Sequence, residues 1–125
     1  TLRTMGAVGT VQRIVDVLPV ELQQQARVQL ADTLRGIVVQ QLVPGVEGGM
    51  VLAAEVLVAT PAVRSAIRDG DPAALEKAIL GGTGAGMRTM DQALASLVQQ
   101  RRVRASEALA RAVDPTELRY LLGQE

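Results

Sequence analysis

The 125-residue sequence contains no cysteine and no histidine. Disulfides, thiolate nucleophiles, imidazole bases and the usual zinc ligands are therefore excluded, and we expect no redox or transition-metal site. Tyr120 is the only aromatic residue, so almost nothing is present on which nucleic-acid bases could stack. Lys+Arg and Asp+Glu both total 13, so no overall charge attracts nucleic acid or an anionic membrane. We therefore expect no nucleic-acid partner.

Long hydrophobic runs are also missing. No apolar stretch approaches the roughly 20 residues of a membrane-spanning helix, so we expect no transmembrane segment. The absence of cysteine fits a reducing cytoplasm. The sequence begins with Thr1 rather than Met, in a stretch from Leu2 that is typical of a short strand. We therefore expect it to be part of a longer protein.

The first half of the chain changes from helical to extended periodicity. Apolar residues at positions 11, 14, 15 and 18 predict a first helix, which Pro19 separates from a second one. The second helix has an expected apolar stripe at 22, 26, 30 and 34, with Gly36 placed to end it. Residues 37–43 and 51–58 are β-branched apolar runs joined by a glycine-rich tip, which predicts a hairpin. Their nearly continuous hydrophobicity predicts strands covered on both faces.

Glu55 interrupts the second of these strands. An unpaired buried charge is costly, so this carboxylate is expected at a sheet edge or paired with an arginine. A functional contact is the alternative, because perturbed charges cluster at sites.

From Thr60 onward the sequence predicts only helices. Thr60 can cap a helix that has Pro61 in its first position and Gly70 as its left-handed stop. Arg64 and Arg68 are four residues apart, so they project from one side of that helix as a paired anion-binding edge.

Four further helices follow from local signals. Asp71 and Pro72 begin one that the glycines at 81 and 82 end, and Thr89 with Gln92 has capping-box spacing. Residues 106–113 form a short helix, and the last one begins at Asp114 and Pro115 and ends at Gly123.

Two segments invite functional readings. Residues 81–86 have the glycine spacing of a phosphate loop, but Met87 and Arg88 follow where that loop needs Lys and then Ser or Thr. The segment also follows a helix rather than a strand, so a flexible connection is the better interpretation. Arg101, Arg102 and Arg104 fit a solvated helix end or, alternatively, an interface to an acidic surface.

Several stretches match one known family in order along nearly the whole chain. They are residues 1–7, 13–17, 40–42 with Pro44, 55–61 and 86–94, with 107–109 after them. Residues 62–69 also match, with identity at Ala62, Arg64, Ile67 and Arg68. The family that these stretches resemble is that of the type IV pilus retraction ATPases, the bacterial motors of twitching motility. Residues 90–94 favour this branch over the pilus assembly and type II secretion ATPases.

This resemblance implies an α/β fold, the C-terminal part of a RecA-like ATPase domain. Residues 1–60 would be the C-terminal portion of the RecA-like core, a short strand plus the hairpin of 37–43 and 51–58, and residues 61–125 a helical C-terminal subdomain. It also implies a cytoplasmic homo-hexamer at the inner membrane, in contact with the pilus machinery there, that uses ATP and Mg. The phosphate loop and the Walker B residues of such a motor are not in this sequence. We therefore expect the 125 residues alone neither to bind nucleotide nor to hydrolyse ATP.

The resemblance also assigns roles to particular residues. Arg3 and Thr4 would lie near the nucleotide, and Ala62, Arg64, Ile67 and Arg68 would belong to the helix that couples nucleotide state to retraction. The sequence departs from the family at Arg3, where the family has histidine, and within 62–69, where Ser65 and Ala66 replace Asn and Leu and Asp69 replaces Glu. Such departures favour a divergent or second paralogue. The alternative function is a helical protein-interaction scaffold, derived from such a motor and no longer catalytic.

Overall fold

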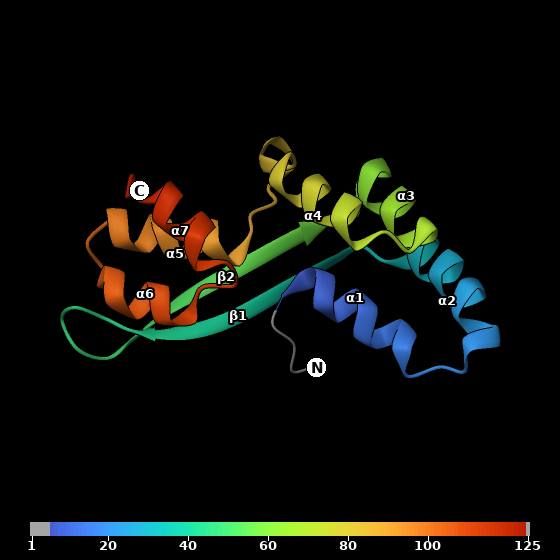
Figure 1. Ribbon diagram of the computed structural model, residues 1–125, viewed down its shortest axis with the longest axis horizontal. Coiled ribbons are helices and arrows are strands. Elements are labelled where there is room, and N and C mark those ends of the chain that lie inside the picture. The colour runs from blue at the N-terminus through green and yellow to red at the C-terminus, as the bar shows by residue number, and fades with distance from the viewer. Residues whose placement is uncertain (1–5, 125) are drawn as a thin grey trace.

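The computed structural model describes residues 6–124, so the strand expected from Leu2 lies outside the described residues. Its elements are α1 (Ala7–Asp16), α2 (Val20–Thr33), β1 (Gly36–Pro44), β2 (Met50–Val58), α3 (Pro61–Asp69), α4 (Pro72–Leu80), a 3-10 turn (Thr83–Ala85), α5 (Met90–Gln99), α6 (Ala105–Arg111) and α7 (Pro115–Leu121). Figure 1 shows the hairpin of β1 and β2 running along the molecule, with α1 to α4 near its open end and α5 to α7 near its turn.

The predicted hairpin is confirmed. The two strands form a two-stranded antiparallel sheet, in which Gly36 pairs with Val58 at the open end and Pro44 with Met50 at the turn. The turn contains Gly48 and Gly49, both with positive φ angles of 88° and 68°, which glycine adopts without a steric penalty.

Within residues 6–124 only one face of the hairpin is covered, whereas both were expected to be. Side chains alternate across a strand, and only one set faces the helices. The opposite set leaves Val38, Leu42, Met50 and Leu52 about half exposed, at 60%, 57%, 58% and 48%. This alternation could not be predicted from the sequence, because the side chains on both faces of the strands are mostly apolar.

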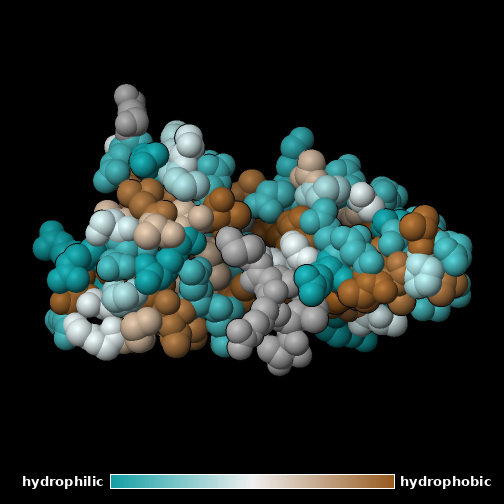
Figure 2. Space-filling model, turned by 60° about the horizontal axis from the view of Figure 1, so that its bottom comes forward, coloured by the Kyte–Doolittle hydropathy of each residue, from teal (hydrophilic) through white to brown (hydrophobic). Residues whose placement is uncertain are grey.

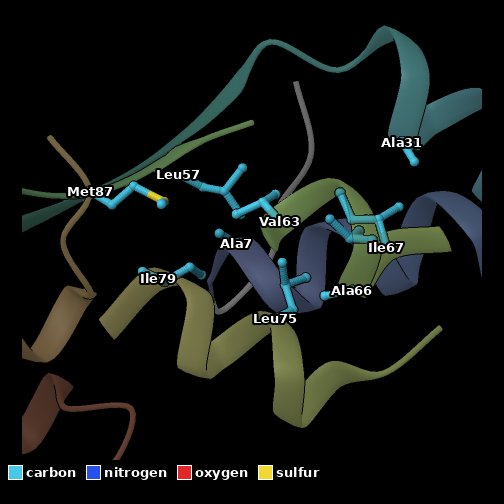
Figure 3. Close-up of a cluster of buried hydrophobic side chains, with 10 residues drawn as sticks. Ala7, Ala31, Leu57, Val63, Ala66, Ile67, Leu75, Ile79 and Met87 are labelled. Atoms are coloured by element: carbon cyan, nitrogen blue, oxygen red, sulfur yellow. The ribbon is translucent and has the colours of Figure 1, made fainter. Parts of the chain in front are cut away.

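Two hydrophobic clusters lie along the inner face of the hairpin. One joins α1, α2, α3 and α4 around Leu57, and Figure 3 shows its side chains converging from these helices. The other joins α5, α6 and α7 around Val43 and Ala53. Val39 packs against both clusters. Each cluster contains residues from both parts of the chain, 1–60 and 61–125. The division of the chain into these two parts stays a prediction.

Local capping signals place the later helices as predicted. Thr60 accepts a hydrogen bond from the Val63 amide, and Gly70 ends α3 with a left-handed φ of 65°. Asp71 and Asp114 cap α4 and α7 in the same manner, with a proline in the first turn of each helix. Thr89 and Gln92 form the complete capping box of α5.

The second helix differs from its prediction in two respects. It ends at Thr33, because Leu34 turns to an extended conformation and packs against the first cluster, and Gly36 instead opens β1. Its only buried residue is Ala31, whereas Leu22 at the start of the expected stripe is 46% exposed. Figure 2 shows hydrophobic surface, in brown, at the end of the molecule where α1 and α2 meet.

Within residues 6–124, no helix combines the length and the hydrophobicity that crossing a bilayer requires.

Candidate functional site

The helix with the predicted coupling residues is α3, which follows β2 after only two residues. Its Val63, Ala66 and Ile67 are buried in the first hydrophobic cluster, between the residues contributed by α1 and α4. Ala62, in the first turn, is exposed. Ile67 thus holds the helix in the core, while the arginines lie outside it.

Arg64 contacts the C-terminal end of α2. Its guanidinium donates a hydrogen bond to the carbonyl oxygen of Ala31, in the last turn of that helix. The last carbonyls of a helix lack partners within it and carry its negative dipole end. Because α2 has no basic residue of its own in that turn, Arg64 supplies the cation from another helix.

Arg68 also contacts α2, so the two arginines lie on the same side of α3. Its guanidinium is 3.7 Å from the Asp32 carboxylate, in an ion pair whose side chains are 45% and 63% exposed. The Gln24 side chain of α2 donates to the Arg68 carbonyl oxygen at 3.2 Å. These contacts fasten α3 to α2, and binding of an anion by the two arginines stays a prediction.

The structure does not place the predicted nucleotide-proximal residues, because Arg3 and Thr4 lie outside the described residues. Residues 81–86 follow α4 and contain the 3-10 turn, as expected of a helix connection. Within residues 6–124 no strand leads into a glycine loop followed by lysine, and Lys77 lies inside α4. The described residues therefore do not form a phosphate-binding loop.

Glu55 is buried, at 5% exposed, and lies on β2, an edge strand of the two-stranded sheet, so the first of its two expected environments, the sheet edge, is the one found. No arginine pairs with it among the described residues. Its Oε1 accepts a hydrogen bond from the Ala7 amide, and its Oε2 accepts one from the Met90 amide at 3.2 Å. Ala7 and Met90 are the first residues of α1 and α5, so two helix N-termini take the place of an arginine.

The protonation equilibrium of Glu55 reflects opposing effects. Burial raises the pKa of its carboxyl group above the ordinary value, the two backbone N–H groups lower it, and the nearby Asp91 carboxylate raises it further. The net pKa is raised, because burial penalises the charged form most.

A cavity of about 270 Å³ opens beside Glu55. Its acidic lining consists of Glu55, Glu76, Asp91, Asp114 and Glu117. Glu76 is an exposed residue, but the pKa of its carboxyl group is raised. The main cause is partial burial, followed by the charges of Glu55 and Asp91. Such a lining repels phosphate, and the described acidic residues form no group that could hold a metal ion.

Asp91 is a second buried carboxylate, at 5% exposed. It accepts hydrogen bonds from the Val113 and Asp114 amides, both at 2.9 Å, and so fixes the loop before α7 on α5. Nothing in the sequence distinguishes Asp91, because an acid in the first turn of a helix has an ordinary explanation in the helix dipole.

The arginine run lies between α5 and α6, next to the turn of the hairpin. The Val46 amide donates to the Arg102 carbonyl oxygen at 3.0 Å, and Arg101 has a left-handed φ of 60°. The side chains of Arg101, Arg102 and Arg104 are exposed and form no ion pair within the described chain.

Comparison with known proteins gives matches over nearly the whole chain. A protein named twitching motility protein, from Neisseria gonorrhoeae, is 37% identical over 121 residues, which are 96% of this chain and 32% of that relative. The type IV pilus retractation ATPase PilT of Pseudomonas aeruginosa is 36% identical over 115 residues, 92% of this chain and 33% of that relative. The chain thus spans about a third of the length of the curated relatives that it matches. It matches none of the protein-family models.

Solved structures agree with these sequences. The crystal structure of the pilus retraction motor PilT with bound ADP has a TM-score of 0.86 and 36% identity, over 96% of this chain and 33% of that one. The X-ray structure of the Legionella pneumophila ATPase DotB has a TM-score of 0.70 and 25% identity, over 86% of this chain and 29% of that one. The class that these likenesses define is that of bacterial ATPases related to PilT and DotB.

Within that class, the chain is homologous to the C-terminal part of the type IV pilus retraction ATPases. The resemblance found in the sequence is confirmed, as is the predicted fold class.

Proposed function

We propose that this chain is the C-terminal segment of a hexameric ATPase that powers type IV pilus retraction. The observation that carries the proposal is the match to the retraction motor PilT over 96% of the chain at a TM-score of 0.86. ATP and Mg would bind to the full-length protein, and a cytoplasmic hexamer at the inner membrane would contact the pilus machinery.

The coupling role falls to α3 in this proposal. Ile67 is buried in the first cluster, and Arg64 and Arg68 hold α2, so α3 and α2 would move as one unit. Arg3, in place of the family histidine, would sense the phosphates with a charge that does not titrate near neutral pH.

The full-length protein in its bacterium provides the test. We expect the wild type to hydrolyse ATP and support twitching, and we expect the double variant Arg64→Ala and Arg68→Ala to lose twitching. Arg119→Ala is the matched control, because Arg119 is an exposed arginine of α7 without an ion pair among the described residues. Absence of ATP hydrolysis by the wild type would refute the motor, and unchanged twitching and ATPase activity in the double variant would refute the coupling role of α3.

Arg3→His in the same protein tests the phosphate-sensing role. Restoring the family residue should change ATP turnover or nucleotide affinity, and a variant unchanged in both properties contradicts that role. The purified 125 residues alone should give no ATP turnover.

A further inference from the structure

Two groups of helices pack on the hairpin, α1 to α4 and α5 to α7, and both line the cavity of about 270 Å³ beside Glu55. Residues 6–9, at the start of α1, line it from the first group together with Glu76 and Leu80 of α4. Residues 89–91, at the start of α5, and Glu117 of α7 line it from the second group. Among the described residues the closest helix packing joins α2 to α3, α3 to α4 and α5 to α7. Direct helix packing is therefore weaker between the two groups than within them.

The buried carboxylate of Glu55 lies where the two hydrophobic clusters meet. On β2 the inward-facing residues in order are Ala53, Glu55 and Leu57, of which Ala53 belongs to the second cluster and Leu57 to the first. Val39, which pairs with Glu55 across the hairpin, packs against both clusters. On β2 the junction between two apolar regions is thus a carboxylate.

The hydrogen bonds of Glu55 connect the two helix groups. Ala7, which donates to Oε1, is the first residue of α1, and Met90, which donates to Oε2, is the first residue of α5. The residue before α1 provides no side-chain cap, so Glu55 serves this helix as an acceptor from a distant strand. The segment before α5 is itself fixed to β2, because the backbones of Val56 and Arg88 exchange two hydrogen bonds of 3.0 Å. One carboxylate therefore holds α1 against a start of α5 that β2 already fixes.

We propose that the Glu55 carboxylate couples the two helix groups, so that they open and move together. Since both hydrogen bonds end on the same carboxylate, α1 cannot leave β2 without displacing that group, and its displacement breaks the bond to α5. A disturbance in the first cluster is transmitted to the second group by this route. The inference goes beyond the proposed function, because the coupling concerns two parts of this chain and holds whether or not the protein hydrolyses ATP.

Asp91 offers a matched control. Like Glu55, it is 5% exposed and accepts two backbone hydrogen bonds, but its donors, the amides of Val113 and Asp114, belong to the loop before α7 in its own helix group. A glutamine or asparagine side chain has one oxygen acceptor where the carboxylate has two. Glu55→Gln can therefore hold only one of the two groups, whereas Asp91→Asn loses a bond inside the second group.

The experiment measures amide hydrogen exchange in the full-length protein, with Ile67→Ala as the disturbance. Ile67 is 2% exposed in the first cluster, and its truncation leaves a cavity there. With Glu55 and Asp91 intact, Ile67→Ala should speed exchange at least tenfold in both α3 and α5, since amides of one cooperative unit exchange together. In the Glu55→Gln background the same substitution should still speed exchange in α3 at least tenfold, but in α5 less than twofold. In the Asp91→Asn background both helices should again respond at least tenfold.

Three results would overturn the coupling role. They are an α5 that does not respond to Ile67→Ala when Glu55 is intact, an α5 that responds equally in the Glu55→Gln background, and a response that Asp91→Asn abolishes as well. Should Glu55→Gln fail to fold, Glu55→Asp is measured by the same criteria, because the shorter acid keeps the charge but cannot span both amides. The measurement involves no nucleotide, so its result is independent of whether the proposed motor function holds.

Discussion

Arg101 occupies a backbone conformation that suits glycine. It is the residue after the C-cap of α5, with a φ of 60°, and it is the only residue other than glycine with positive φ among residues 6–124. The Arg101 amide donates to the Val98 carbonyl at 2.9 Å and the Arg102 amide to the Leu97 carbonyl at 3.0 Å. These two bonds are those of a Schellman motif, whose left-handed position is usually glycine.

We predict that Arg101→Gly stabilises the chain. A Cβ atom in the left-handed region costs about 1–2 kcal/mol, which glycine avoids. Glycine also gives the unfolded chain more conformational freedom, which offsets about 0.4–1 kcal/mol of that gain. The Arg101 side chain is exposed and forms no ion pair within the described chain, so little else is lost. The free energy of unfolding should rise by about 0.5–1 kcal/mol and the melting temperature by about 2–4 °C.

Urea denaturation and thermal melting of two control variants isolate the cause. Arg101→Ala removes the same charge but keeps a Cβ atom, so it should give no such gain. Arg102→Gly removes an exposed arginine where φ is not positive, so it should lower the free energy of unfolding. The reasoning is refuted if Arg101→Gly is no more stable than Arg101→Ala, or if both glycine variants change stability alike.

Three further predictions concern the core, the α2–α3 contact and the buried acid. Ile67→Ala should cost about 2–5 kcal/mol in urea denaturation, because this fully buried side chain leaves a cavity; a loss below 1 kcal/mol would contradict its packing. Arg64→Ala should cost about 1–2 kcal/mol through the lost hydrogen bond to α2, and Arg68→Ala less than about 0.5 kcal/mol because its ion pair is exposed; the reverse order would show that Arg64 does not hold α2. The raised pKa of Glu55 favours its protonated form in the folded protein. This stabilisation is complete below the unfolded pKa of about 4.3 and is lost as pH rises through the higher folded value. The free energy of unfolding of wild type minus that of Glu55→Gln should therefore fall as the pH rises above about 4.3, and a level or rising difference would count against the raised pKa.

Features governed by neighbouring residues were predictable from the sequence. The cap at Thr60, the capping box of Thr89 and the left-handed stop at Gly70 each involve groups within five residues of one another, and all three are present. The hairpin followed from two apolar runs around a glycine-rich turn, and its register places the predicted strands together.

The contacts of the candidate site were not predictable in the same way. Glu55 was conspicuous in the sequence, but its donors are 48 and 35 residues away, and a backbone amide has no sequence signature. The contact of Arg64 with Ala31 spans 33 residues and also ends on backbone. Only the packing of the helices around the hairpin determines which main-chain groups such side chains meet.

The exposed face of the hairpin has a consequence for handling the chain by itself. Among residues 6–124 each strand of this two-stranded sheet has an outer edge whose N–H and C=O groups lack a further strand partner, apart from local pairing such as that of Val56 with Arg88. The same hairpin also exposes the apolar side chains of Val38, Leu42 and Leu52. Strands of other copies can add to such edges, and the resulting sheets can stack through such an apolar face. The isolated chain should therefore form β-rich aggregates as its concentration rises. Val38→Lys should slow this aggregation without altering the strand register.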